Sequence, residues 1–180
     1  SGGRLIALFT GWVGWSAIED GTDFAPSTTT GAGAQSLAIT GTPTQHHEYK
    51  GVYAVADGFI TATKFGVLKS TLIDSINPFR HDPLSDEHIP FNQKCVARIG
   101  TYSWIFLTTT GLYKTNGKNF EVWQPLLSEY LKQVEIPTFS LNTIGQVQLH
   151  YDENRQWFFI SYAKTRNVNS FSNGLVAYLP

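Results

Sequence analysis

Two clusters of histidine and acidic residues are the most obvious candidates for chemistry in this sequence. The first is His46-His47-Glu48; the second comprises His81, Asp82, Asp86, Glu87 and His88. Metal ligands on one rigid element usually recur at short, regular intervals, and neither cluster shows such spacing. Both fall in expected loops, so we expect solvated side chains. The alternative is a calcium clip at a subunit contact, formed by the oxygens of Asp82, Asp86 and Glu87. We predict no metal ligands and treat the second cluster as a candidate interface loop.

The motifs that usually accompany catalysis are missing. A hydrolase of the sialidase type would need clustered arginines, a tyrosine nucleophile and repeated S-x-D-x-G-x-x-W turns. The sequence has no such turn, and its arginines are scattered at Arg4, Arg80, Arg98, Arg155 and Arg166. It also lacks a Gly-x-Ser-x-Gly elbow, a phosphate-binding loop and a dinucleotide fingerprint. We therefore predict a protein that is not an enzyme and has no catalytic or cofactor-binding residues and no cofactor.

Cys95 is the only cysteine, so the described sequence can form neither an internal disulfide nor a thiolate zinc site. Its position at the start of an apolar run predicts a small buried side chain rather than a nucleophile.

The five tryptophans have two interpretations, sugar binding and core packing. Trp104 and Trp157 occupy matching points of apolar runs, where a β-sheet buries large residues, and we expect them in the core. Trp12 and Trp123 flank expected turns and are more open to a binding role. Trp15 lies close to Trp12 in the first apolar segment.

One passage of the sequence occurs twice and indicates how the chain is organised. Residues 56–70 return as residues 101–115, and Gly66 and Gly111 are 45 positions apart. Each copy is an apolar run, a short Thr/Lys turn, a glycine and a second apolar run, which predicts a β-hairpin. A hairpin unit at roughly 40–50 residues is the period of a β-propeller blade. We expect Gly66, Gly111 and Gly174 to be structural.

The remaining segments extend this pattern to three or four blades of unequal length. Hairpins are expected over 4–19, 104–123 and 147–162, with a last strand at 175–178, a short strand near 35–39 and a helix over 126–134 that is closed by Pro137. Long loops are expected at 20–48, 76–92 and 163–173. The prediction is an all-β, propeller-like single domain over 1–180, or a fragment of one, because a closed ring needs about four to eight blades.

Composition restricts the function classes. The chain of 180 residues has 13 basic and 14 acidic residues, a net charge of −1, and no Lys/Arg stripe, so tight electrostatic binding of nucleic acid is not expected. Aromatic content is 14% and charged content only 15%, which predicts an ordered domain. No apolar run approaches the ~20 residues of a membrane span, and no signal peptide is visible. The absence of methionine and the strand-like segments at both ends favour a fragment or a processed product.

The order of motifs resembles the β-propeller tail proteins of short-tailed bacteriophages, the hub or nozzle family. The matching motifs are the segment from Val13 to Phe24, Gly31-Ala32-Gly33-Ala34-Gln35, the hairpin ending in Phe65-Gly66-Val67-Leu68-Lys69-Ser70, the segment from Cys95 to Gly117, and Tyr151 to Tyr162. The likeness covers most of the chain in the same order. It departs from the family at Gly21, where proline is frequent.

This resemblance implies a structural protein that forms a ring with copies of itself and with neighbouring tail proteins around the DNA-ejection channel. It implies a place in the virion tail, assembly in the host cytoplasm, DNA only as passing cargo, and no stable membrane association. The second hypothesis is a receptor- or glycan-binding propeller module of an adhesin or tail fibre. The third is a polysaccharide hydrolase on a propeller scaffold.

Overall fold

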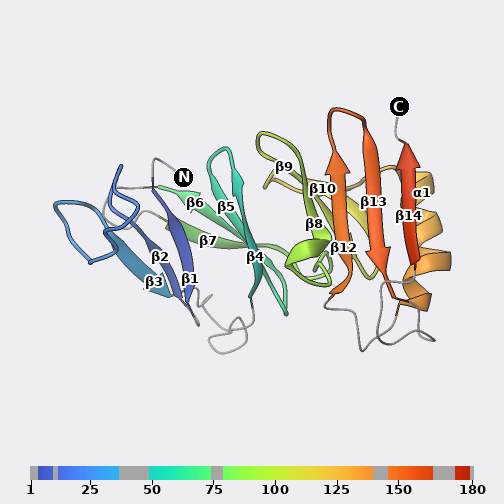
Figure 1. Cartoon of the computed structure of the whole chain (residues 1–180). Helices are drawn as coiled ribbons and strands as arrows, with labels where there is room; N and C mark the ends of the chain where they lie inside the picture. Colours follow the sequence, from blue (N-terminus) through green and yellow to red (C-terminus); the bar gives the residue numbers. More distant parts are fainter. Residues whose placement is uncertain are drawn as a thin grey trace. The chain divides into compact units, whose positions relative to one another are not determined.

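The computed structural model describes residues 4–9, 12–36, 49–73, 79–139, 146–163 and 173–178 (Figure 1). Contacts divide the chain into two compact units, Ser1–Asp86 and Glu87–Pro180, and each is described by itself. That these units belong to one propeller-like domain, or to a fragment of one, stays a prediction. Residues 164–172 of the expected loop at 163–173 and residues 37–48 of the expected loop at 20–48 lie outside the described residues.

The fold is all-β with one short α-helix in the described part of the chain. Its strands form four antiparallel, blade-like sheets, in the orders β1-β2-β3, β4-β5-β6-β7, β11-β10-β9-β8 and β12-β13-β14. The strands of the first unit are β1 (Ile6–Phe9), β2 (Trp12–Trp15), β3 (Gly33–Ser36), β4 (Tyr49–Val55), β5 (Gly58–Thr63), β6 (Val67–Leu72) and β7 (Phe79–Ser85). Those of the second are β8 (Val96–Gly100), β9 (Ser103–Thr108), β10 (Gly111–Thr115), β11 (Phe120–Val122), β12 (Gln148–Asp152), β13 (Trp157–Tyr162) and β14 (Asn173–Tyr178).

The first unit packs its two sheets together through aromatic side chains. Trp15 on β2 meets Phe79 on β7 edge to face, with ring centroids 5.4 Å apart. Phe79 in turn meets Phe59 on β5 in the same geometry at 4.9 Å. Val13 completes this buried cluster, and β2 thereby fixes the first sheet against the second.

The duplicated passage forms the same hairpin in both units. β5 pairs with β6 and β9 pairs with β10 in antiparallel register. Thr63 Oγ1 donates to the carbonyl of Gly66 at 2.9 Å, and Thr108 Oγ1 donates to the carbonyl of Gly111 at 3.2 Å. Each threonine hydroxyl also accepts a backbone N–H two residues later, at 3.2 and 3.1 Å. The repeat therefore encodes a turn that its own threonine closes.

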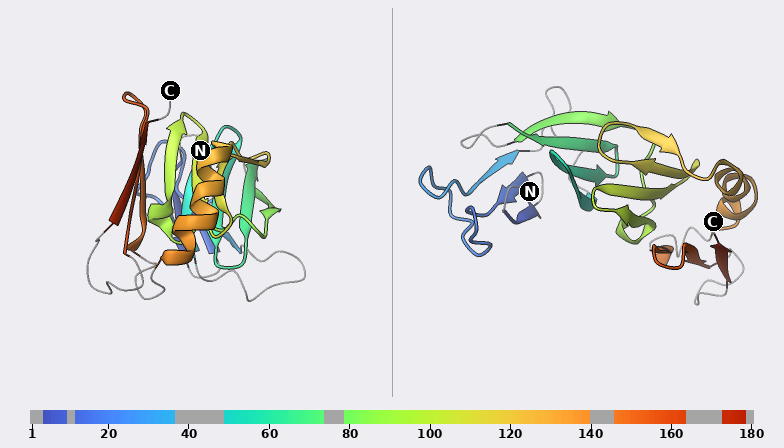
Figure 2. Two further views of the ribbon diagram at one scale, coloured as in Figure 1. Left: turned by 90° about the vertical axis from the view of Figure 1, so that its right-hand side faces the viewer. Right: turned by 90° about the horizontal axis from the view of Figure 1, so that it is seen from above.

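The second unit has the larger core, which lies between its two sheets and a helical segment. The expected helix is confirmed: α1 spans Pro125–Tyr130, continues as one π-helical segment over Leu131–Glu135, and ends in a 3₁₀ turn at Ile136–Thr138. Figures 1 and 2 show its axis roughly parallel to β13 and β14. Leu131 is fully buried with residues of β9, β10, β12 and β13.

The helix does not bury the face that the sequence suggested. In the sequence, periodicity places five apolar residues on one helical face: Leu126, Leu127, Tyr130, Leu131 and Val134. The structure buries Leu131 and partly buries Leu127, but Leu126, Tyr130 and Val134 are exposed. These three residues are spaced by four and form an apolar stripe on the solvent-facing side of the helical segment. The residues that face the core are Ser128, Leu131 and Glu135.

The expected loop at 76–92 is wrong over its central part. Phe79–Ser85 forms β7, which pairs with β6 from Leu72↔Phe79 to Val67↔Ser85. Pro83 suggested a loop, but β7 is the last strand of its sheet, and a proline on an edge strand removes no ladder hydrogen bond. The register shifts between Val67 and Leu68, beside the proline.

Candidate functional site

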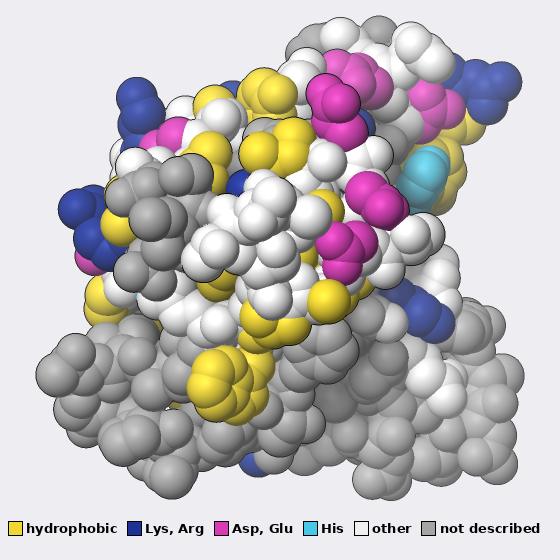
Figure 3. All heavy atoms as spheres, turned by 90° about the vertical axis from the view of Figure 1, so that its left-hand side faces the viewer, with side chains coloured by type: hydrophobic (Ala, Val, Ile, Leu, Met, Phe, Trp, Pro, Cys, Tyr) yellow, Lys and Arg dark blue, Asp and Glu magenta, His cyan; other side chains and the backbone are white. Residues whose placement is uncertain are grey.

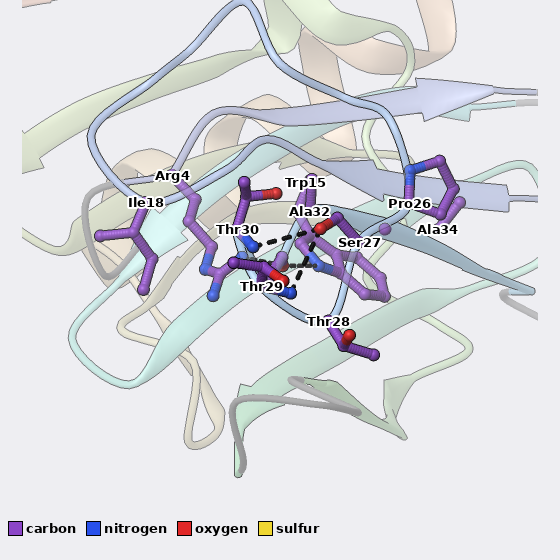
Figure 4. A pocket seen from close by; sticks show the side chains of 12 residues that line it. Arg4, Trp15, Ile18, Pro26, Ser27, Thr28, Thr29, Thr30, Ala32 and Ala34 are labelled. Atoms are coloured by element: carbon purple, nitrogen blue, oxygen red, sulfur yellow. Dashed lines mark hydrogen bonds between the residues drawn. The ribbon is translucent and has the colours of Figure 1, made fainter.

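A pocket of about 450 Å³ lies in the first unit and is formed by the loop that leads into β3. The loop contributes residues 26–34, while Arg4 enters from the segment before β1 and Trp15 from the end of β2 (Figure 4). This volume lies within the roughly 300–1,000 Å³ of ordinary small-molecule sites. The sequence showed this loop only as a Ser/Thr-rich stretch, so the pocket was not predicted.

Arg4 and Trp15 both donate a hydrogen bond to the carbonyl oxygen of Gly31 and thereby hold the loop. The guanidinium of Arg4 donates through Nη1 to the carbonyl of Gly31 and, at 3.1 Å, to that of Ser16. The indole Nε1 of Trp15 donates to the Gly31 carbonyl at 2.9 Å. Gly31 has φ +69°, and a Cβ there would lie 2.7 Å from Arg4 Nη2, so a larger residue would be strained and would push the guanidinium away. Arg4 is only 8% exposed, which places a permanent positive charge at the pocket wall.

Ser27 organises the rest of the loop. Its hydroxyl accepts the backbone N–H groups of Thr29 and Thr30, both at 3.2 Å, as drawn in Figure 4. Its carbonyl accepts the N–H of Gly31 at 2.8 Å, and its own N–H donates to Ala32 at 3.0 Å. These bonds close the loop on itself, as in other serine and threonine turns. The side chains of Thr28, Thr29 and Thr30 are left exposed along it.

An acidic turn adjoins the pocket without lining it. Ile18 joins the pocket wall, and the next residues, Glu19 and Asp20, are exposed. Hydrogen bonds from the side chain and then the backbone of Thr22 hold the pKa of Asp20 below its ordinary value. Figure 3 shows acidic side chains gathered over one part of the face drawn there, beside an area of uncharged polar and backbone atoms.

The second histidine and acidic cluster is divided between the two units, and its members have different partners within them. His81 lies on β7, where its Nδ1 is 2.7 Å from Ser70 Oγ on β6, and burial lowers its pKa, with Asp82 acting in the opposite direction. Asp82 receives a 2.8 Å hydrogen bond from Arg80 Nε. His88, in the other unit, stacks on Phe120 and meets Tyr113 edge to face. Asp86 and Glu87 stand on either side of the unit boundary.

Among the described residues, no group of three or more His, Cys, Asp or Glu side chains could hold a metal ion. The first cluster, His46-His47-Glu48, lies outside the described residues. The described part of the chain also contains no helix with the length and apolar character needed to cross a bilayer.

The tryptophans that the structure buries are not the ones that the sequence predicts to be buried. Trp157 was expected in the core but is 41% exposed, and Trp104 is only half-buried. Trp157 lies at the first position of β13, and Arg155 stands over its ring, 6.0 Å from the centroid. The buried tryptophan is Trp15. Trp12 is exposed, whereas Trp123 packs against Tyr151 and Phe158 of the second core.

The three predicted structural glycines differ in how strictly they are required. Gly111 has φ +128°, and a Cβ there would clash with Ser128 Oγ. At Gly66 a Cβ would lie 3.1 Å from the carbonyl oxygen of Ser85, which is tight but without a positive φ. At Gly174 the nearest atom would be 3.4 Å away, an ordinary contact. Geometry therefore demands glycine at Gly111 most strongly.

The second unit also buries a thiol and a carboxylate, those of Cys95 and Glu135. Cys95 is fully buried, as predicted, and its Sγ lies 3.2 Å from the carbonyl of Val147. The carboxylate of Glu135, which the sequence did not single out, accepts a hydrogen bond from Tyr130 at 2.7 Å and another from the buried Tyr162. Burial and then the hydrogen bond to Glu135 raise the pKa of Tyr162. These bonds tie the end of the helical segment to β13.

Comparison with protein-family models and with curated proteins found no match to this chain.

Proposed function

We propose that the chain is a structural component of a bacteriophage tail, of the hub or nozzle kind. In this proposal several copies, with neighbouring tail proteins, build a ring around the DNA-ejection channel in the virion, after assembly in the host cytoplasm. The supporting observation is the repeated hairpin, with the same threonine-closed turn 45 residues apart in two four-stranded sheets. Repeated four-stranded units are what propeller blades consist of.

The surface of the helical segment supports an assembly role. Leu126 is 90% exposed, and Tyr130 and Val134 lie on the same stripe at 42% and 48%. Exposed apolar side chains that gather on one element suit a permanent interface, whose buried centre is depleted in charge. The net charge of −1 supports DNA as a passing cargo, because a tight grip on phosphates would need several basic groups on one face.

Mass spectrometry on purified particles of the phage that encodes the chain tests the proposal. Peptides of the chain should copurify with portal and capsid peptides at constant stoichiometry, and chemical cross-links should join two copies of the same lysine. Particles that lack the chain, or a chain that never cross-links to itself or to a tail protein, would overturn the proposal.

The apolar stripe supplies a sharper form of this test. Leu126→Ser should leave folding unchanged, because the side chain lies in solvent, and should lower incorporation of the chain into particles by about tenfold if the stripe is at the interface. Glu129→Gln, an exposed change on the same helix, is the matched control. Equal incorporation of both variants would show that the stripe is not part of the interface.

A further inference from the structure

We propose that the outer face of the β12–β13–β14 sheet binds an uncharged, β-linked sugar chain, with Trp157 and Phe159 stacking on the sugar rings. The outer face is the side of this sheet that points away from the core, and it carries Gln148, His150, Trp157, Phe159, Ser161 and Val176. The inference goes beyond the structural role proposed above and does not depend on ring assembly, because all these residues lie in one sheet of a single chain.

Alternation along β13 separates the two faces of the sheet. Alternate residues from Phe158 to Tyr162 are buried in the core of the second unit, and the helical segment lies on that side of the sheet (Figure 1). Trp157 and Phe159 therefore belong to the outer face, because successive side chains of a strand point to opposite sides. Trp157 is 41% exposed. The outer face thus presents an indole ring to solvent on a strand that the sheet holds in place.

Three aromatic rings adjoin one another on the outer face. The centroid of the Phe159 ring lies 5.9 Å from that of Trp157 and 6.1 Å from that of His150 on β12. Val176 of β14 is paired with Phe159 and is 62% exposed. These ring separations are close to the length of one hexose unit. The faces of aromatic rings carry partial negative charge, so they attract the weakly positive C–H groups of a sugar ring.

Polar side chains on the same face can bond the hydroxyl groups of a sugar. Gln148 and Ser161 are paired across β12 and β13, and both are exposed. Neither side chain makes a hydrogen bond within the described part of the chain. An amide and a hydroxyl both donate and accept, as sugar hydroxyls do. Polar groups among the rings favour a sugar over a partner protein, because an apolar protein contact would leave them unpaired.

The charges beside the outer face disfavour an anionic chain. Arg155 stands over the Trp157 ring, 6.0 Å from its centroid, but its guanidinium also lies 3.9 Å from the carboxylate of Asp152. Glu153 is exposed in the same turn, so two carboxylates and one guanidinium give the turn a net negative charge. A polyanion such as nucleic acid would need several basic groups on this face. The face therefore fits an uncharged chain.

A binding assay on the full chain at neutral pH tests the proposal. The uncharged probes are cellohexaose and mannohexaose, both β-linked; the anionic probes are a hexamer of galacturonate and a hexamer of thymidylate. We expect a Kd of about 1 mM or tighter for at least one uncharged probe and at least about tenfold weaker binding of both anions. In NMR spectra the shifts should centre on β12 to β14 and on the indole N–H of Trp157.

Tryptophan variants separate the site from the fold. Trp157→Ala should weaken binding at least about tenfold, because it removes the most exposed ring of the site, and Trp157→Phe should restore part of it. Trp12→Ala is the matched control, since Trp12 is 51% exposed on β2 of the other unit, and it should leave the Kd unchanged. Gln148→Ala should weaken binding by about fivefold through the loss of a hydrogen bond. Circular dichroism should be the same for all four variants and the parent.

Three results would overturn the proposal. The first is the absence of saturable binding by both uncharged probes up to about 10 mM, which is weaker than several stacked rings should give. The second is an equal Kd for Trp157→Ala and the parent protein, since the sugar would then lie elsewhere. The third is self-association of the parent chain that Trp157→Ala abolishes, which would assign the face to a second copy. Failure here leaves the tail proposal standing, because that proposal is tested on particles and not on sugar binding.

Discussion

The β5–β6 and β9–β10 hairpins have similar sequences and the same turn, but different elements pack against them. In both, a threonine at the end of the first strand bonds the carbonyl of the glycine three residues later. Gly66 then lies against the backbone of β7, whereas Gly111 lies against Ser128 of the helix, with a positive φ. The turn is thus a property of the repeated passage, whereas the space around each glycine is set by the element that packs against it, β7 for Gly66 and α1 for Gly111.

The cores of the two hairpins differ in the same way. Phe59 and Trp104 are equivalent positions of the repeat, 45 residues apart. Phe59 is buried between two sheets through Phe79, but Trp104 is half-buried in a hairpin whose main core lies around Ile105 and Leu107. Equivalent residues of a repeat therefore need not carry equal shares of the stability.

The largest expected effect tests this inequality. Phe59→Ala should lower the free energy of unfolding by about 3–5 kcal/mol, because it removes a buried ring that packs on Phe79 in the core cluster of its unit. Trp104→Ala should cost only about 1–2 kcal/mol, since much of its surface already faces water. Urea denaturation followed by circular dichroism measures both. Equal losses would show that the two blades are energetically alike.

The glycines provide the next comparison. Gly111→Ala should cost about 2–3 kcal/mol, because the new Cβ meets Ser128 in a backbone conformation that alanine avoids. Gly66→Ala should cost no more than about 1 kcal/mol, since the neighbouring backbone has to give way only slightly. The same denaturation experiment measures the difference. A larger cost at Gly66 would contradict the assignment of strain to the second hairpin.

The turn itself should respond equally in both copies. Thr63→Val and Thr108→Val each remove a hydroxyl that donates to the glycine carbonyl and accepts a backbone N–H. Each change should cost about 1 kcal/mol, and the two values should agree within about 0.5 kcal/mol. Thermal unfolding of the two variants measures this. A clear difference would mean that the shared turn is not equally important in the two units.

The free energy of unfolding should depend on pH through the first copy of the repeat and not through the second. Ser70 bonds His81, whereas its counterpart in the repeat, Thr115, bonds the backbone N–H of Gly117. Burial lowers the pKa of His81 below its ordinary 6.5, so the unfolded chain binds this proton more readily than the folded one. The contribution of His81 is therefore present above about pH 6.5 and is lost as the pH falls toward its folded pKa.

His81→Gln should flatten this dependence. Urea denaturation of the parent protein and of the variant between pH 8 and pH 5 compares the two slopes. An unchanged slope in the variant would assign the loss of stability at low pH to other groups.

Much of the fold was predictable, because alternation, turn residues and the repeat are local signals. They located the two hairpins of the repeat and the helical segment that begins at Pro125. The sequence-based predictions failed for features that depend on residues far away in the chain. Pro83 concealed β7, because an edge strand tolerates a missing donor, and Trp157 resembled a core residue although it lies at a strand end.

The candidate site was the least predictable part. Arg4 and the 27–31 loop are about 25 residues apart, and no local pattern indicates that a guanidinium will bond the Gly31 carbonyl. The only sequence signal was the run Ser27-Thr28-Thr29-Thr30-Gly31, which indicates a turn and is silent about a pocket. The histidine clusters were the more conspicuous pattern, yet the described members of the second cluster have separate partners.

Cryo-electron microscopy of virus particles purified from a culture that produces the chain would test most directly the central claim, that the chain is a component of a phage tail. The account predicts copies of this chain in a ring around the DNA channel, with β5–β6 and β9–β10 as corresponding strands of two blades and the Leu126 stripe at a contact between proteins. A tail whose channel wall contains no copy of the chain would contradict it.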